Sequence, residues 1–129
     1  MENQNQQIKE KSTAYVFVYD GCAQFEIVLA NYFLNTKMNV CTVGLSEHIV
    51  TSIEQFQIKP HLVLSNIGIE REDLFVIPGG DPSELLKNDL LYKFLSSIKA
   101  TGSKAAAICA GTVLLAKAGL LEGRKYTTS

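Results

Sequence analysis

The chain predicts an α/β fold in which a mostly parallel sheet lies between two layers of helices. Short apolar segments rich in β-branched residues alternate with segments whose apolar residues recur at helical spacing. The apolar segments are continuous, as in strands that are buried on both faces. At 129 residues, with 47% hydrophobic and 19% charged, the chain has the size and composition of one globular domain. Residues 1–13 are polar and without periodicity, which predicts an arm before a domain that spans 14–129.

The first half of the chain predicts two buried strands with a helix between them. The strands are expected at Ala14–Tyr19 and Val40–Leu45, where apolar residues run without interruption up to a turn. The helix is expected from about Gln24 to Thr36. Its apolar residues form one stripe: Phe25, Val28, Leu29, Tyr32 and Phe33. Two short strands are expected at Ile49–Thr51 and His61–Leu64, away from the main sheet.

The second half predicts the same alternation, with strands at Leu74–Ile77 and Lys104–Ile108. A helix is expected to begin just after the turn that ends the first of these strands. Asp81 suits its N-cap, Pro82 its first position, and Glu84 completes a capping box. The stripe of this helix consists of Leu90, Leu91, Phe94, Leu95 and Ile98.

The C-terminal part predicts one more helix. Gly102 stands where the C-terminal cap of the preceding helix is expected. A further helix is expected after the Cys109-Ala110-Gly111 corner, through about Ala118. Arg124–Thr128 predicts the start of another strand.

Charge and cysteine content exclude several classes of protein. The 12 basic and 13 acidic residues are well mixed, so no basic stripe predicts binding to nucleic acid. No apolar run approaches the roughly 20 residues of a membrane-spanning helix, and the N-terminus lacks the apolar core of a secretory signal. Three cysteines in such a chain predict reduced thiols and a cytoplasmic location. His48 and His61 share no ligand spacing with other residues, so we expect neither a metal nor a cofactor.

Cys109 lies at a predicted corner between a strand and a helix. Such a corner is typical of a nucleophile elbow, and Ala107 and Gly111 are small enough to permit the sharp turn. The N–H groups at the start of the following helix would favour a thiolate. The alternative is that Cys109 is one more small apolar residue of an alanine-rich strand.

Two other positions allow a functional and a structural interpretation. Gly79 and Gly80 end a parallel strand near the elbow, where their N–H groups could stabilise an oxyanion. They could equally form a simple turn before a capped helix. Glu26 lies in the first turn of the first helix, where it could be a solvated residue that favours the positive helix end. If buried over the site, it could stay protonated and act as an acid–base group.

Three segments resemble the ThiJ/PfpI superfamily, which has the class I glutamine amidotransferase-like fold, a flavodoxin-like three-layer sandwich. They are FEIVLANYFLNTKMNVCTVGL, DLFVIPGGDPSELLKNDLLYKFL and AAAICAGTVLLAKAGLLEGRKYTTS. Their most specific feature is a PGG turn that precedes an A-I-C-A-G elbow by about one helix and one strand. The resemblance implies that Cys109 is a nucleophile contacted by Glu26. It also implies that Gly79, Gly80 and Ala110 supply the surrounding backbone N–H groups.

The chain departs from this family in three ways. Ala110 stands where PfpI-type peptidases have histidine, which argues against a peptidase. Ser129, after Thr127-Thr128, stands where many relatives have a histidine that could act as a base. The family's domain usually continues beyond this point for a further strand-and-helix portion, so we expect a C-terminally incomplete domain with an open apolar face. Since many relatives are dimers, the resemblance implies a homodimer.

The resemblance implies a cysteine-dependent enzyme that acts on a small electrophilic molecule, as a hydrolase or lyase. The candidate substrates are isocyanides, small amides and reactive aldehydes such as methylglyoxal, attacked by the thiolate of Cys109. One alternative is an oxidative-stress sensor in which oxidation of Cys109 is read by a partner, with Cys22 as a possible resolving thiol. The other is a ligand-sensing domain, which ranks last because no DNA-binding module is present. Cys41 is expected in the core.

Overall fold

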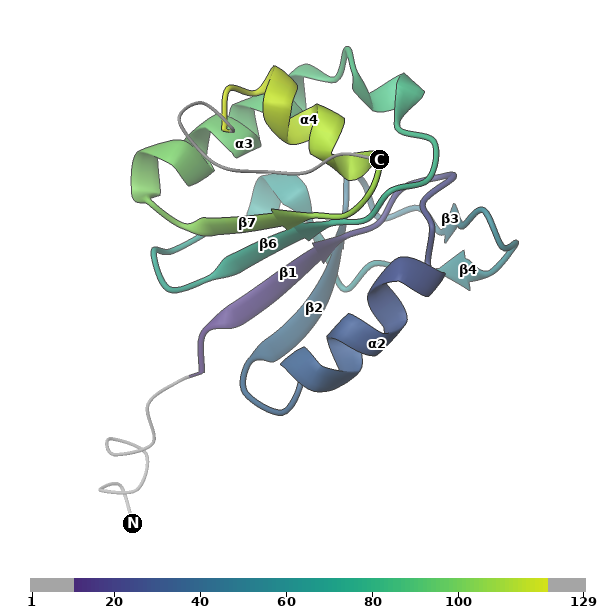
Figure 1. Cartoon of the computed structure of the whole chain (residues 1–129), viewed down its shortest axis with the longest axis horizontal. Coiled ribbons are helices and arrows are strands. Elements are labelled where there is room, and N and C mark those ends of the chain that lie inside the picture. Colours follow the sequence, from purple (N-terminus) through teal and green to yellow (C-terminus); the bar gives the residue numbers. More distant parts are fainter. Residues whose placement is uncertain (1–10, 121–129) are drawn as a thin grey trace.

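The computed structural model describes residues 11–120. Its main sheet has five parallel strands in the order β5-β2-β1-β6-β7 (Figure 1). These strands are β1 (Thr13–Phe17), β2 (Asn39–Gly44), β5 (Leu62–Val63), β6 (Leu74–Ile77) and β7 (Lys104–Ala107). A separate antiparallel hairpin consists of β3 (Val50–Thr51) and β4 (Gln57–Ile58). The predicted α/β fold with a mostly parallel sheet is confirmed.

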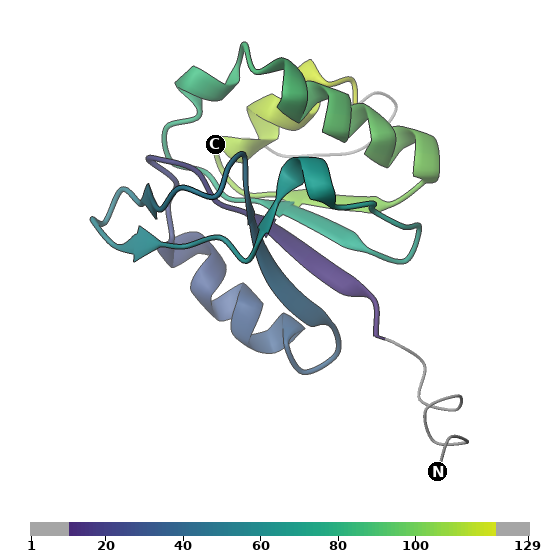
Figure 2. The same ribbon diagram turned by 180° about the vertical axis from the view of Figure 1, so that it is seen from behind.

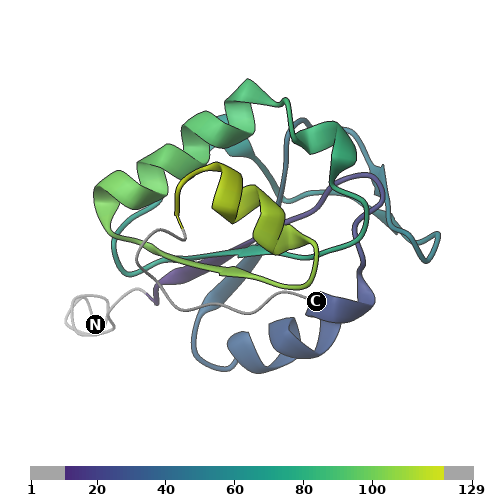
Figure 3. The same cartoon turned by 45° about the horizontal axis from the view of Figure 1, so that its top comes forward.

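Helices cover both faces of the sheet. α3 (Asp89–Thr101) and α4 (Gly111–Lys117) lie side by side on one face, while α2 (Phe25–Leu34) lies on the other (Figures 1 and 3). The view from behind shows the β3–β4 hairpin next to the start of α2 (Figure 2). None of the helices within residues 11–120 has the length and apolar character needed to cross a membrane.

The strand predictions hold with one exception. β1, β2, β6 and β7 lie within two residues of their expected bounds, and β3 lies away from the main sheet as predicted. The expected placement of His61–Leu64 outside the sheet is wrong, because β5 pairs in parallel with β2 through Val43 and Leu62. β5 has only two residues, and an apolar pattern of that length does not show whether a strand belongs to the main sheet. The strand expected at Arg124–Thr128 lies outside the described residues.

The helix expected to begin at Asp81 is wrong in its starting point. Asp81 accepts a hydrogen bond from the Ser83 N–H (3.2 Å), but the following turn is only a short 3₁₀ helix, η2 (Ser83–Leu85). α3 begins later, where the Asn88 side chain accepts a hydrogen bond from the Leu91 N–H (2.9 Å). Of the two capping signals, the one directly before the apolar stripe starts the helix. Gly102 ends α3 in the left-handed region (φ 76°), as predicted.

The apolar stripe of α2 does not face the core, which corrects the prediction of an ordinary amphipathic helix. Its five residues are between 54% and 70% exposed: Phe25, Val28, Leu29, Tyr32 and Phe33. The helix instead buries Ile27 (3% exposed) and packs Leu34 against the core. Because α2 is apolar on nearly every side, residue spacing could not tell which side faces the sheet.

Aromatic residues from three elements meet in the core between the sheet and α3. The ring of Phe75 in β6 lies 6.0 Å from that of Phe17 in β1 and 4.9 Å from that of Phe94 in α3, measured between centroids. Phe17 and Phe75 are fully buried. This packing fixes β1 and β6 side by side, and the loops that follow these two strands form most of the candidate site.

Candidate active site

Cys109 occupies the sharp corner between β7 and α4, as the elbow interpretation predicts (Figure 3). Its side chain is exposed, and its backbone is left-handed with φ 53°, which is uncommon for a residue other than glycine. Gly111 allows the corner to close, because a Cβ there would lie 2.7 Å from the Ile77 carbonyl oxygen. A strained backbone that exposes a thiol at the end of a parallel strand is typical of a nucleophile elbow.

The carboxyl group of Glu26 reaches the turn opposite this corner. Its Oε1 atom accepts a 2.7 Å hydrogen bond from the Gly79 N–H. A Cβ placed on Gly79 would lie 2.9 Å from Glu26 Oε1 and 3.0 Å from Cys109 Cβ. Since both distances start from one point, the two atoms are no farther apart than their sum, about 6 Å. The structure thus brings together Glu26, Gly79 and Cys109, which come from three distant parts of the chain.

The three backbone N–H groups expected around the thiol have different surroundings. The N–H of Gly79 is engaged by Glu26 and is not directed at a substrate. The N–H groups of Gly80 and Ala110 make no hydrogen bond to another residue within 11–120. The Ala110 nitrogen lies 3.0 Å from the position of a Cβ on Gly79, so it borders the same point as Cys109. Gly80 and Ala110 are therefore the better candidates for stabilising an oxyanion.

Two strand-like hydrogen bonds hold the Pro78-Gly79-Gly80 turn against the loop after β1. The Ala23 N–H donates to the Gly79 carbonyl (2.8 Å), and the Asp81 N–H donates to the Gly21 carbonyl (3.0 Å). They flank a close pairing of Gly80 with Cys22. The loop that begins α2 and the turn that accepts Glu26 therefore form one unit.

Tyr19 holds this turn in place through its hydroxyl group. The sequence predicted only an apolar strand residue at this position. Its hydroxyl donates to the carbonyls of Pro78 (3.0 Å) and Gly79 (2.8 Å). The side chain is only 4% exposed. Burial raises the pKa of Tyr19 well above its ordinary value, and the nearby Cys22 and Glu26 act in the same direction.

We expect Tyr19→Phe to lower the free energy of unfolding by about 1 to 3 kcal/mol, because the buried Pro78 carbonyl loses a donor. The effect depends on pH. With a raised pKa in the folded state, the neutral hydroxyl contributes its full stability below about pH 10, and this contribution is lost as the pH rises. Urea unfolding at pH 7 and pH 10.5 should show a smaller alkaline loss in the variant. An equal alkaline loss in both proteins would contradict this account.

Glu54 is a second residue that sequence analysis missed. Its two carboxylate oxygens accept hydrogen bonds from the N–H groups of Gln24 (3.0 Å) and Phe25 (2.8 Å), and so cap α2 from the β3–β4 hairpin. Desolvation raises the pKa of Glu54, but hydrogen bonds led by the Phe25 N–H outweigh it and leave the pKa lowered. No local signal reveals this cap, because Glu54 is 29 residues from Phe25. It fixes the first turn of α2, which carries Glu26.

The remaining sequence candidates lie elsewhere. Cys22 is fully buried, and this burial raises the pKa of its thiol, which does not favour a resolving role. Cys41 is half-buried in β2. His61 Nδ1 accepts a hydrogen bond from the Thr42 N–H (2.9 Å) near the β5 edge of the sheet. Among residues 11–120, no three His, Cys, Asp or Glu side chains gather as a metal site would require.

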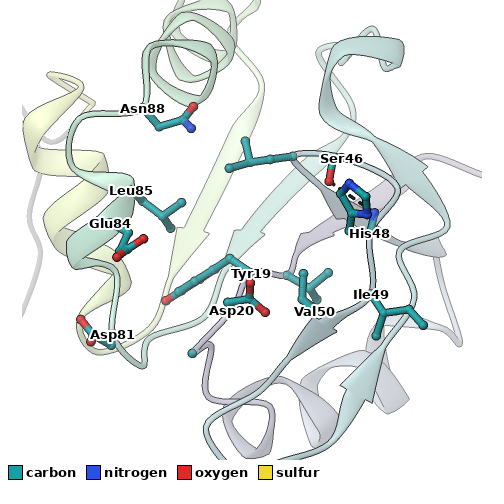
Figure 4. Close-up of a pocket in the computed structure, with 13 residues that line it drawn as sticks. Tyr19, Asp20, Ser46, His48, Ile49, Val50, Asp81, Glu84, Leu85 and Asn88 are labelled. Atoms are coloured by element: carbon teal, nitrogen blue, oxygen red, sulfur yellow. Dashed lines mark hydrogen bonds between the residues drawn. The ribbon is translucent and has the colours of Figure 1, made fainter.

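A cavity of about 690 Å³ lies beside the candidate site (Figure 4). Tyr19 and Asp20 stand between its two walls, one formed by residues 46–50 and the other by residues 81–88. His48 lines the cavity on the first wall, next to Ser46 (Figure 4). Neither Cys109 nor Glu26 lines this cavity, so its size alone does not identify the reactive centre.

The sequence model of the DJ-1/PfpI family matches residues 12–129. The chain belongs to the DJ-1/PfpI family. A Bacillus subtilis relative named as an uncharacterized protease is 33% identical over 94 residues, which cover 72% of this chain and 44% of that protein. The Drosophila melanogaster protein dj-1beta is 28% identical and is matched over 90% of this chain and 64% of its own length. A protein of Pyrococcus horikoshii named as a deglycase is 30% identical over 61% of this chain and 48% of its own.

Solved structures of DJ-1/PfpI proteins share the fold. A Bacillus anthracis ThiJ/PfpI family protein superimposes with a TM-score of 0.83 at 26% identity, over 94% of this chain and 62% of that one. Drosophila DJ-1beta gives a TM-score of 0.74 at 26% identity, over 85% and 61%. The chain spans about half the length of the curated relatives it matches.

We expect Cys109 to be the most reactive of the three thiols. It is exposed at the start of a helix, whereas Cys22 is buried and Cys41 lies within a strand. Brief treatment of the folded protein with iodoacetamide at neutral pH, read by peptide mass spectrometry, should modify Cys109 first. Faster modification of Cys22 or Cys41 would contradict the elbow assignment.

Proposed function

We propose that Cys109 is the nucleophile of an enzyme that acts on a small electrophilic carbon compound. The observation that carries this proposal is the convergence at Gly79: Glu26 Oε1, Cys109 Cβ and the Ala110 nitrogen all lie within 3.0 Å of one point. A nucleophile, a proton-carrying group and a backbone donor are the three parts that thiol catalysis requires. Relatives named as deglycases and as a protease support a hydrolytic reaction.

The proposed first step is addition of the Cys109 thiolate to an electrophilic carbon. With a 2-oxoaldehyde, a C–S bond forms, and the π electron pair of the carbonyl moves to oxygen. The N–H groups of Gly80 and Ala110 stabilise the developing charge, and Glu26 supplies the proton that yields a hemithioacetal. Glu26 Oε1 is held by Gly79, which leaves Oε2 to carry the proton.

A small amide would share the thiolate addition but not the protonation of the oxygen. The oxyanion would re-form its C=O bond as the C–N bond breaks, and the departing amine would take the proton from Glu26, leaving a thioester on Cys109. Water would then cleave the thioester and restore the thiol. An isocyanide would be attacked at its terminal carbon, and a proton from Glu26 would give a thioimidate. Water would then add to that carbon, the C–S bond would break with release of the thiol, and an N-substituted formamide would remain.

We do not expect peptidase activity from this arrangement. By the resemblance to PfpI-type peptidases, the position directly after the nucleophile would need a histidine, and here it is Ala110. An alanine cannot take a proton from the thiol, so the base that follows the nucleophile in those peptidases is absent here. We therefore do not propose peptides as substrates, although the B. subtilis relative is named as a protease.

The test is a turnover screen with isocyanides, small amides and 2-oxoaldehydes, each with wild type and Cys109→Ser. We expect one class to be turned over, and Cys109→Ser to lose that activity by at least 100-fold. Cys41→Ser is the matched control, since it also removes one thiol but leaves the elbow intact. Turnover that survives in Cys109→Ser would overturn the proposal.

A redox-sensing role is the second candidate, and the exposure of Cys109 favours it. An exposed thiol meets peroxide as readily as it meets a carbon electrophile. Treatment with an excess of peroxide, which supplies the two oxygen atoms that a sulfinic group needs, followed by mass spectrometry, should then convert Cys109 to its sulfinic form while no substrate class is turned over. Turnover in the screen would favour the enzyme.

A further inference from the structure

The cavity of Figure 4 lies where open parallel sheets usually bind small molecules. β2 and β6 flank β1 on opposite sides, and the helices that follow β1 and β6 lie on opposite faces of the sheet (Figure 1). The chain therefore diverges at the carboxyl ends of β1 and β6, which leaves a crevice there. The cavity is lined by residues that follow β1, β2 and β6, among them Tyr19, Asp20, Ser46, His48, Asp81 and Glu84. Its volume of about 690 Å³ is within the usual range for small-molecule sites.

Hydrogen bonds attach both walls of the cavity to the loop after β1. Asp20 Oδ1 accepts a hydrogen bond from the Thr51 N–H (2.8 Å), and the Gly21 N–H donates to the Thr51 carbonyl (2.8 Å). Thr51 directly follows the wall of residues 46–50. The Asp81 N–H, at the start of the other wall, donates to the Gly21 carbonyl (3.0 Å). The cavity is therefore held open by the chain itself, so a ligand would cost little rearrangement.

The lining of the cavity carries three carboxylates: Asp20, Asp81 and Glu84. Within residues 11–120, no lysine or arginine lines the cavity to balance them. Asp20 and Asp81 each accept a backbone hydrogen bond through Oδ1, so each keeps a second oxygen for a ligand. Hydrogen bonds from Ser83 lower the pKa of Asp81, which is therefore charged at neutral pH. The cavity thus favours a positively charged occupant.

The arrangement of these groups fits an organic cation better than a metal ion. In the part of the chain that the structure describes, no three acidic, histidine or cysteine side chains gather closely enough to hold a metal. Asp81 and Glu84 lie on one wall, whereas Asp20 lies between the two walls (Figure 4). Apolar side chains form much of the remaining lining: Val18, Leu45, Ile49, Val50 and Leu85. A cationic group joined to an apolar body would match both kinds of surface.

We propose that this cavity binds a small organic cation, an amine or guanidinium compound with an apolar body. The cationic group lies at the wall that carries Asp81 and Glu84, and the apolar body lies against Ile49 and Val50 of the other wall. The site is separate from the reactive centre, because Cys109 does not line the cavity. Binding there does not depend on the proposed function.

Three compounds that share a phenyl ring and differ at one end group test the charge of the ligand. They are phenethylamine, 2-phenylethanol and phenylacetate, each titrated into the isotope-labelled 129-residue chain and followed by NMR chemical shifts. We expect phenethylamine to bind with a dissociation constant of about 1 mM or lower. The neutral alcohol should bind about 10-fold more weakly, because it lacks the charge-assisted hydrogen bond, and the anion should not bind. Equal affinities for the amine and the alcohol, or no binding of the amine, would overturn the proposal.

The double variant Asp81→Asn with Glu84→Gln tests where the amine binds. Both side chains are exposed and keep their size, and the amide oxygen of Asn can still accept from the Ser83 N–H. Affinity for phenethylamine should fall about 10-fold, since an exposed ion pair contributes up to about a factor of five. The matched control is Glu70→Gln with Glu72→Gln, which removes two exposed charges before β6, at the opposite edge of the sheet. Equal losses in the two double variants would overturn the proposed site.

Alkylation of Cys109 with iodoacetamide separates this site from the reactive centre. The alkylated chain should bind phenethylamine as tightly as the untreated chain, because Cys109 does not line the cavity. Loss of binding on alkylation would place the amine at Cys109 and overturn the proposal of a separate site.

Discussion

Gly80→Ala should lower the free energy of unfolding by at least about 3 kcal/mol, the largest loss we expect from one methyl group in this protein. Gly80 has φ 117°, a region that residues with a side chain rarely adopt. An added Cβ would overlap the Gly21 carbonyl oxygen and lie 2.8 Å from the Ala23 nitrogen. Both neighbours are backbone atoms fixed by the pairing of the turn with the loop before α2, so neither can move cheaply.

The matched control is Gly68→Ala, since a Cβ on Gly68 has no neighbour within 4 Å. Urea unfolding followed by circular dichroism gives the free energy of both variants. Gly68→Ala should stay within about 0.5 kcal/mol of wild type, as expected for a surface change. If Gly80→Ala is equally mild, the turn and the loop are not held together as described.

Glu26→Leu should lower turnover of the substrate found in the proposed screen by about 100-fold to 10,000-fold, the usual range for loss of an acid–base group. It also leaves the Gly79 N–H without its acceptor. Glu26→Gln should retain more activity, because its amide oxygen can still accept from Gly79 and its NH₂ group can donate to the sulfur. Steady-state rates of the three proteins at one pH give the comparison.

The rate of iodoacetamide alkylation of Cys109 tests how Glu26 acts, independently of any substrate. If a protonated Glu26 donates a hydrogen bond to the thiolate, both variants should be alkylated more slowly than wild type at neutral pH. The decrease should be larger in Glu26→Leu than in Glu26→Gln, because the amide can still donate. If Glu26 is ionised, its negative charge opposes the thiolate, and both variants should react faster. The two mechanisms differ in sign, so faster alkylation in both variants would defeat the protonated-carboxyl account.

The parts of the site that lie on regular elements could be predicted from the sequence. Cys109 and the Gly79-Gly80 turn each follow a continuous apolar strand, and parallel strands bring their carboxyl ends to one edge of the sheet. The role of Glu26 could not be predicted in this way, because its neighbours in the sequence do not distinguish a buried carboxyl group from a solvated one. Only the family resemblance assigned it a role, and its hydrogen bond to Gly79 places it at the turn.

Contacts between distant segments could not be predicted from local patterns. In a hydrophobic pattern Tyr19 is treated as an apolar residue. Its hydroxyl nevertheless donates hydrogen bonds to two carbonyl oxygens of a turn about 60 residues away. The outward orientation of Phe25 and Leu29 was hidden because α2 is apolar on both sides. Spacing identifies a helix, but its rotation about the axis depends on which neighbours are present.

The cap that Glu54 places on α2 also affects the order of events during synthesis. A ten-residue helix is marginal in water by itself, and the first turn of α2 obtains its acceptors only after some 29 further residues have been made. At ordinary elongation rates this delay is on the order of seconds. On the nascent chain α2 therefore forms first without its cap. Closure of the β3–β4 hairpin supplies the cap, and the Glu26 side chain gains its hydrogen bond only later, when the turn that contains Gly79 has been made.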